Sequence, residues 1–246
     1  MTHRAIILAA GASRRMGELT HAAPKCLLAV GERTLLHNQL EALSAVGVTD
    51  ATLVVGYREG MVREAAQRYV GDRMALSFIV NEDYAATNTL HSLWLAREVL
   101  AQGSFLLNAD VFFEPKLLSR LAESPYPATL AVVNKPCGEE EVKYRCGNGG
   151  EVVELSKAVG PQLALGEAIG VSRFEAPFCE AFVESLDACI QAGRSQDFYE
   201  LAIDRILPNP NVHALDISDL VAIEIDFVND LEEARRLSAG MELKGT

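Results

Sequence analysis

Three fixed positive charges lie in one short stretch near the start of the chain, LAAGASRRMGELTHAAPK, residues 8–25. Arg14, Arg15 and Lys25 supply them, and only Glu18 opposes them there, although the whole chain has a formal net charge of −12. A guanidinium can hold two phosphate oxygens at once, and an ammonium acts as a point charge beside them. The stretch therefore predicts a local anion site in an acidic protein, with Arg15 and Lys25 as its charged groups.

Small residues surround these charges and favour the same chemistry. With little side chain in the way, a backbone approaches a ligand closely, and its free N–H groups can form a concavity for an anion. The stretch lacks the Walker A pattern and the G-x-G-x-x-G spacing of a dinucleotide fold, and no helix is expected to start there. The alternative is an ordinary loop with solvated arginines. The residues expected to meet the anion are Leu8, Ala9, Ala10, Gly11, Ala12 and Ser13.

Carboxylates end two later apolar segments. Asp110 closes SFLLNAD, and Glu224 and Asp226 alternate with apolar neighbours in AIEID, so they share one face of a strand. Mg²⁺ prefers hard oxygen ligands and keeps several waters, so carboxylates at strand ends suit it. Two structural alternatives are open. Asp110 caps the turn before Pro115, or Asp226 or Asn229 caps the helix that follows.

Apolar periodicity places these residues on predicted elements. Strand–helix alternation in the first half predicts a mostly parallel sheet with helices on both faces. Ligands bind such sheets outside the carboxyl ends of the strands, which is where the charged loop and Asp110 fall. The expected strands are 5–9, 51–56, 75–80 and 104–110, and the expected helices are 34–46, 58–70 and 88–101.

The second half has a different pattern. Short expected strands separated by Gly-rich turns predict an antiparallel extension of the sheet, with GNGG, residues 147–150, as a hairpin turn. No repeat, low-complexity stretch or linker interrupts the chain, so residues 1–246 are expected to form one domain. The expected strands here are 128–134, 141–146, 151–156, 167–174 and 221–226, and the expected helices are 176–192, 197–206 and 230–238.

Composition narrows the class of protein. The acidic balance argues against broad nucleic-acid binding, for which a basic face is expected. No apolar stretch reaches the roughly 20 residues that a membrane span needs, and the N-terminal apolar run is too short for a signal peptide, so the expected location is the cytoplasm. Five cysteines without a C-x-x-C pair argue against a disulfide framework and a zinc site. Exposed sheet edges leave a homodimer open.

The charged loop also resembles a known family. The nucleotidyltransferases that make sugar nucleotides and CDP-activated phospho-compounds share the signature A-A-G-x-[GS]-x-R-M-G followed by L-T-x-x-x-P-K-x-L, which this chain resembles with AAGASRRMG and LTHAAPKCLL. The small CTP-dependent phosphocholine and phosphonate cytidylyltransferases are most similar in VNEDYAATNTLHSLWLAR, GEAIGVSRF and AIEIDFVNDLEEA. The resemblance implies a Rossmann-like three-layer α/β/α nucleotidyltransferase fold with a mixed, mostly parallel sheet. It implies a nucleotide-binding half in residues 1–127 and an acceptor-binding half in 128–246.

The resemblance implies roles for the residues singled out above. Asn88 stands at the position that contacts the pyrimidine base, although an asparagine there also suits a helix N-cap. The implied catalytic residues are Arg15, Lys25, Asp110 and Asp226, the implied metal ligands are Asp110 and Asp226 with Glu224 as a further candidate, and the implied nucleotide-binding residues are Leu8, Ala9, Ala10, Gly11, Ala12, Ser13, Arg15, Lys25, Asn88 and Asp110.

An acceptor site is implied in the second half. The family meets the acceptor phosphate with a lysine, and Lys157 in VVELSKAVG stands at the matching place. Glu167 in GEAIG matches a position that faces a cationic group in relatives that handle amines, and Tyr199 and Glu200 in DFYELA are assigned to the same pocket. An aromatic face with carboxylates suits a quaternary ammonium. Phe198 replaces the first of two tyrosines in the family pattern, and packing of Phe198 and Tyr199 within a helix is the alternative.

The implied reaction is transfer of CMP from CTP to a small phosphate or phosphonate monoester, with Mg²⁺ and release of pyrophosphate. The second pKa of a phosphate monoester is about 6, so the attacking oxygen of the acceptor is already anionic at neutral pH and needs no general base. Two rivals are open: a hexose-1-phosphate nucleotidylyltransferase that uses UTP, dTTP or GTP, and a non-catalytic nucleotide-binding protein. The sequence leaves the acceptor among phosphocholine, an aminoalkylphosphonate and a hydroxy- or carboxyphosphonate.

Overall fold

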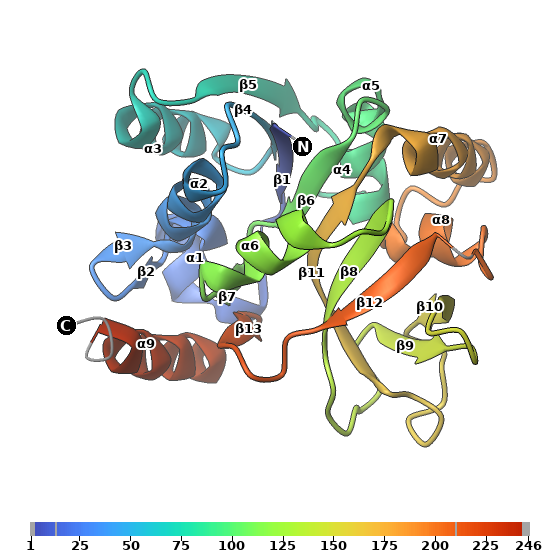
Figure 1. Ribbon diagram of the computed structural model, residues 1–246. Coiled ribbons are helices and arrows are strands. Elements are labelled where there is room, and N and C mark those ends of the chain that lie inside the picture. The colour runs from blue at the N-terminus through green and yellow to red at the C-terminus, as the bar shows by residue number, and fades with distance from the viewer. Residues whose placement is uncertain (1–2, 13, 210, 243–246) are drawn as a thin grey trace.

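The computed structural model describes residues 3–12, 14–209 and 211–242 of the chain (Figure 1). Four parallel strands form one half of its central sheet: β1 (Arg4–Ala9), β4 (Asp50–Val55), β5 (Ala75–Val80) and β6 (Ser104–Asn108). They lie in the order β5–β4–β1–β6, with Ile7 paired to both Leu53 and Leu107. The short apolar run of β1 is buried on both sides, as a covered parallel strand requires.

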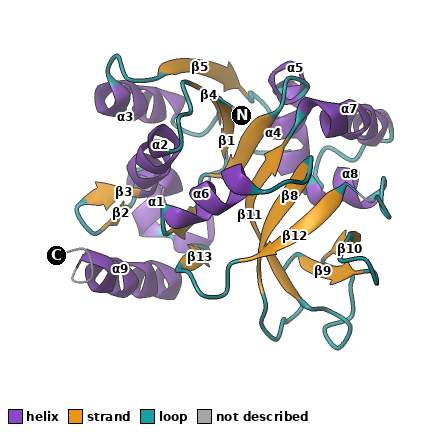
Figure 2. Ribbon diagram, in the orientation of Figure 1, coloured by secondary structure: helices purple, strands orange, loops and turns teal. Residues whose placement is uncertain are grey.

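Helices cover both faces of this sheet (Figure 2). One face packs against α2 (Leu35–Ala45), α3 (Glu59–Val70) and α6 (Lys116–Glu123), and the other against α4 (Thr89–Leu95), α5 (Arg97–Leu100), α7 (Ala176–Gln191) and α8 (Glu200–Asp204). Alternate residues of β1 divide between the two cores, because successive side chains point to opposite faces. Ile7 is buried with Leu40 of α2, whereas Ile6 is buried with Leu93 of α4. The predicted three-layer α/β/α fold is confirmed.

The second half extends the sheet with antiparallel strands, as predicted. These strands are β8 (Ala128–Val133), β9 (Lys143–Cys146), β10 (Val152–Ser156) and β11 (Gly166–Phe174). β11 lies beside β6 and pairs antiparallel with β6, β8 and β9. Residues 147–150 form the predicted turn between β9 and β10, in which Gly150 has a φ of 85°. A further strand that was not predicted, β12 (Val212–Asp216), pairs parallel with β8.

Helical turns form in the charged loop, so the expectation that no helix starts there is wrong. The chain turns at Gly17, where φ is 55°, and the side chains of Met16 and Thr20 are buried, which anchors the turns on either side. A short hairpin follows the loop. These elements are η1 (Arg14–Met16), α1 (Glu18–Ala22), η2 (Lys25–Leu27), β2 (Ala29–Val30) and β3 (Arg33–Thr34).

A small ribbon connects the C-terminal part of the chain to the sheet. Its two strands, β7 (Val111–Phe113) and β13 (Ala222–Glu224), pair antiparallel, and α9 (Val228–Glu242) follows. Both carboxylate-bearing strands end earlier than expected, so Asp110 and Asp226 lie in the turns just beyond them. Within the described residues, no helix is long and apolar enough to span a membrane.

Candidate active site

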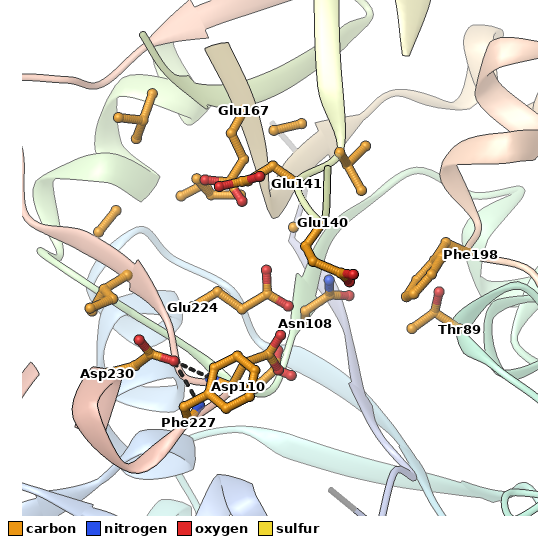
Figure 3. A pocket seen from close by; sticks show the side chains of 18 of the residues that line it. Thr89, Asn108, Asp110, Glu140, Glu141, Glu167, Phe198, Glu224, Phe227 and Asp230 are labelled. Carbon is orange, nitrogen blue, oxygen red and sulfur yellow. Dashed lines mark hydrogen bonds between the residues drawn. The ribbon is translucent and has the colours of Figure 1, made fainter. Parts of the chain in front are cut away.

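A pocket of about 840 Å³ opens beyond the carboxyl ends of β1 and β6, and both halves of the chain line it (Figure 3). This is the edge at which parallel α/β sheets bind ligands. Ala9 lines a smaller adjoining cavity, while Ala10 and Ala12 line neither and Ser13 lies outside the described residues. The sequence-predicted residues that line the pocket are Leu8, Gly11, Arg15, Lys25, Asn88, Asp110, Lys157, Glu167, Glu224 and Asp226.

Lys25 lies at the centre of the charged end of the pocket. Its Nζ donates to Asp110 Oδ2 at 3.0 Å and to Asp226 Oδ1 at 2.9 Å, and its side chain is 8% exposed. Burial lowers the pKa of Lys25, but the two carboxylates raise it by more, so the net pKa lies above its ordinary value and the ammonium stays charged. Arg15 adds an ion pair with Asp226 at 3.3 Å. The predicted cations and carboxylates therefore meet in one cluster.

Three carboxylates converge on the same point. Oxygens of Asp110, Glu224 and Asp226 lie within 4.8 Å of one another. Burial, together with the negative charges of Asp110 and Asp226, raises the pKa of Glu224 well above its ordinary value. Close carboxylate oxygens are the donor set that Mg²⁺ takes in proteins, so these residues fit a hard divalent cation.

The ribbon of β7 and β13 brings these carboxylates together. Glu224 pairs with Val111 across the ribbon, and the Ile225 N–H donates to the carbonyl of Asp110 at 3.0 Å. The start of α9 is capped by Asp230, whose Oδ2 accepts from the N–H groups of Asp226 and Phe227 at 2.9 and 2.7 Å (Figure 3). The carboxylate of Asp226 instead accepts from Lys25 and Arg15, so the reading of Asp226 as a helix cap is not what the structure shows.

Asn88 caps a helix and also lines the pocket. Its Oδ1 accepts from the N–H of Thr89 at 2.8 Å, which caps α4, and the residue also lines the pocket. Its contact with a base stays a prediction.

Two ion pairs lie at the far end of the pocket. Lys135, which the sequence reading missed, places its Nζ 2.6 Å from Glu167, and Lys157 lies 3.8 Å from Glu140. Figure 3 shows Glu140, Glu141 and Glu167 on this side of the pocket. Lys135 follows β8, which pairs with the strand of Glu167, and such a cross-strand neighbour is invisible without the pairing.

Tyr199 does not line the pocket, and the structure corrects its assignment. Its side chain is 2% exposed. The residues on either side, Phe198 and Glu200, line the pocket instead, and the Lys157 ammonium lies 4.5 Å from the centre of the Phe198 ring. The turn into α8 points Tyr199 into the core, so the aromatic face offered to a ligand is that of Phe198.

Glu200 makes stability depend on pH. It is 6% exposed, and burial raises its pKa to about 7, although the Tyr199 hydroxyl and the Lys157 charge lower it. A carboxyl whose pKa is higher in the folded state than in the unfolded state stabilises the folded state when it is protonated. This contribution is complete below the unfolded-state pKa, here 4.5, and is lost as the pH rises through the folded-state pKa of about 7. Glu200→Gln removes the buried charge. The free energy of unfolding of the variant minus that of the wild type should therefore rise by up to about 3 kcal/mol as the pH goes from about 5 to about 8.

Urea unfolding of both proteins at the two pH values measures this gain, and Glu180→Gln, on the exposed side of α7, is the matched control. An equal difference between Glu200→Gln and the wild type at both pH values would contradict the prediction.

Asn108 is a second pocket residue that the sequence reading missed. Its Oδ1 is buried and has no hydrogen-bond partner among the described residues. Gly170 packs directly against it, because a Cβ at Gly170 would lie 2.3 Å from Asn108 Nδ2. The signal was present in LLNAD, where a polar residue closes a buried strand two positions before Asp110.

Gly170→Ala should lower both the melting temperature and kcat/KM. Gly170 has a φ of 68°, which costs a residue with a Cβ about 1–2 kcal/mol, and the new methyl would also displace Asn108 from the pocket. Gly193 is the matched control, since its φ is 74° and nothing lies within 4 Å of a Cβ there. We expect Gly193→Ala to lose stability alone. Equal activity losses in the two variants would count against a role for Asn108.

Known proteins resemble this chain over nearly all of its length. CMP-5'-(3-aminopropyl)phosphonate synthase of Streptomyces rubellomurinus is 35% identical over 94% of this chain, and choline-phosphate cytidylyltransferase of Streptococcus pneumoniae is 27% identical over 95%. The chain spans 38% of the first relative's length and 96% of the second's. A solved structure of CTP:phosphocholine cytidylyltransferase from Streptococcus pneumoniae has a TM-score of 0.78 at 25% identity, covering 96% of this chain and 99% of that chain.

The family model for the MobA-like NTP transferase domain matches residues 5–173, which include the charged loop, Asp110 and all but the last residue of β11. This match covers more than half of the chain and agrees with the resemblance of the loop signature. The chain therefore belongs to the family of MobA-like NTP transferase domains.

Proposed function

We propose that this protein transfers CMP from CTP to a small phosphate or phosphonate monoester and releases pyrophosphate. The observation that carries the proposal is the meeting of Lys25 with Asp110 and Asp226 at one end of a pocket that has Lys157 and Lys135 at the other. Two separate groups of cations suit two phosphorylated substrates. Relatives that match nearly the whole chain, and whose names describe CMP or cytidylyl transfer, support the same reading.

Mg²⁺ is the proposed cation, held by Asp110 and Asp226, with Glu224 as a third ligand. Bound there, a divalent ion would neutralise charge on the phosphates that react. The protein's own groups supply the rest of the electrostatic stabilisation. Lys25 and Arg15 face the phosphates of CTP, and the small residues at the end of β1 let the backbone approach them.

The chemical step needs positioning more than proton transfer. An anionic acceptor oxygen attacks the α-phosphorus in line, a new P–O bond forms, and the bond to pyrophosphate breaks. Because the nucleophile is already ionised near neutral pH, the chain has to hold the acceptor and screen its charge. Lys157 is the proposed contact for the acceptor phosphate, and its position over the Phe198 ring keeps the ammonium inside the pocket.

An acceptor with a positively charged amine fits the far end of the pocket best. Glu140, Glu167 and Glu200 line it together with the ring of Phe198, and a cationic group gains from both carboxylates and an aromatic face. The names of both relatives cited above contain an amine or a choline group. A cytoplasmic location, a homodimer and the absence of nucleic acid and membrane from its partners stay predictions of the sequence.

A pyrophosphate-release assay with Mg²⁺ tests the proposal. CTP, UTP, dTTP, GTP and ATP are each combined with phosphocholine, 2-aminoethylphosphonate, 3-aminopropylphosphonate, a hydroxy- and a carboxyphosphonate, and glucose-1-phosphate. We expect release with CTP and an amine-bearing acceptor. Release only with the sugar phosphate would overturn the proposal in favour of a hexose-1-phosphate enzyme, and CTP binding without release for every acceptor would favour a non-catalytic protein.

A further inference from the structure

A buried glutamine holds the turn that carries Asp110. Gln39 of α2 is 1% exposed, and its Nε2 donates to the carbonyls of Asn108 and Val111, both at 2.9 Å. These two carbonyls flank Ala109 and Asp110, so a single side-chain amide spans the turn from one end to the other. No part of Gln39 lines the pocket, so its effect on the site passes through the backbone.

The position of Gln39 is one at which packing alone favours an apolar residue. Its neighbours on the buried side of α2 include Leu36, Leu40 and Leu43, all at most 1% exposed. Amide groups are costly to bury unless they are hydrogen-bonded, and backbone carbonyls that lose a buried donor carry the same cost. An apolar side chain would fill this position equally well, so the glutamine indicates that its two hydrogen bonds to the turn have a role of their own.

Other contacts tie this turn to the rest of the carboxylate cluster. The Ala109 N–H donates to the carbonyl of Leu8 at 3.1 Å, and the Asp110 carbonyl accepts from Ile225 at 3.0 Å. Leu8 is the last residue but one of β1, which leads into the charged loop, and Ile225 lies between Glu224 and Asp226. Gln39 completes this set from the helix side, so the turn is held from three directions.

We propose that Gln39 is a positioning residue for Asp110, which fixes the turn so that the carboxylate stays within reach of Lys25 and of a divalent cation shared with Glu224 and Asp226. The inference rests on the proposed function only in assigning a cation to these carboxylates. Partners of metal ligands typically change metal affinity by about tenfold or more when they are removed.

Two measurements on Gln39→Met test the proposal, because methionine keeps the length of the side chain and removes both donors. Hydrogen exchange followed by mass spectrometry reports on the amides of residues 108–113, and the electron paramagnetic resonance signal of free Mn²⁺ gives the dissociation constant of Mn²⁺ without turnover. We expect faster exchange in that segment and about tenfold weaker Mn²⁺ binding. Gln39→Leu repeats both measurements with a different apolar shape should the methionine variant fail to fold.

Ser185→Ala is the matched control. It removes another buried hydrogen bond, from Ser185 Oγ to the carbonyl of Ala202 at 2.7 Å, on the opposite face of the sheet. We expect it to lower stability and leave Mn²⁺ binding unchanged. If hydrogen exchange at residues 108–113 is unchanged in Gln39→Met, Gln39 does not hold the turn. If exchange there is faster but the Mn²⁺ affinity is unchanged, Gln39 does not position Asp110 for a cation. Failure of the wild type to bind Mn²⁺ would instead overturn the cation assignment in the proposed function. The exchange data would still decide whether Gln39 holds the turn.

Discussion

Replacing Lys25 with methionine should lower kcat for pyrophosphate release at least about a hundredfold, while the fold survives. Lys25 is a buried cation of the site, and methionine keeps its apolar stem while removing the charge that we propose faces the nucleotide. A contact that neutralises charge developing in the transition state contributes about 3 kcal/mol, which sets the expected loss. Steady-state kinetics with CTP and the best acceptor measure it.

The same variant should bind divalent cations more tightly when no nucleotide is present. In the wild type, the Lys25 ammonium already lies 3.0 Å from Asp110 and 2.9 Å from Asp226, where it competes with a cation for the carboxylates. Lys25→Met therefore separates two effects of opposite sign, a gain in Mn²⁺ affinity and a loss in turnover. Lys116→Met, on the exposed side of α6, is the control. A variant with near wild-type turnover would remove Lys25 from the mechanism.

Asp110→Asn should abolish metal-dependent activity. Asparagine keeps the shape of the side chain but offers a neutral oxygen, and the cluster loses the carboxylate that the structure places between Lys25 and Glu224. We expect kcat to fall by at least about a hundredfold and Mn²⁺ binding to weaken together with it. Pyrophosphate release measured over a range of Mg²⁺ concentrations tests both effects.

The matched control for this substitution is Asp219→Asn. Asp219 is an exposed aspartate that pairs with Arg120 and does not line the pocket, so its loss should leave activity intact. Activity and Mg²⁺ dependence that survive in Asp110→Asn would show that the metal assignment is wrong.

Elements whose apolar pattern is continuous or periodic were predictable from the sequence. The apolar run in β1 and the helical spacing of apolar residues in α2 match the structure closely, because buried faces carry apolar residues at the period of the strand or helix. The predicted helix at 88–101 is instead two helices that meet at Ala96, where the backbone leaves the helical region with φ −94° and ψ 12°. Nothing in the residue types of that segment marks the break.

Residues of the candidate site were predictable where they belong to a short sequence motif or end a predicted strand. The loop signature led to Arg15 and Lys25, and strand ends led to Asp110 and Asp226. Their meeting depends on the pairing of β7 with β13, and the alternation in AIEID predicts the strand β13 but not the partner with which it pairs. The resemblance assigned Tyr199 to the pocket, but a motif does not fix which side chain of the turn into α8 faces the core, and there Phe198 lines the pocket while Tyr199 is buried.

That ribbon has a consequence for the order in which the candidate site can form. Strands up to β12 complete the nine-stranded sheet, yet Asp226 reaches Asp110 only after β13 has paired with β7. The carboxylate cluster is thus built from segments that are synthesised early and late, so it is complete only once the last strand has been made.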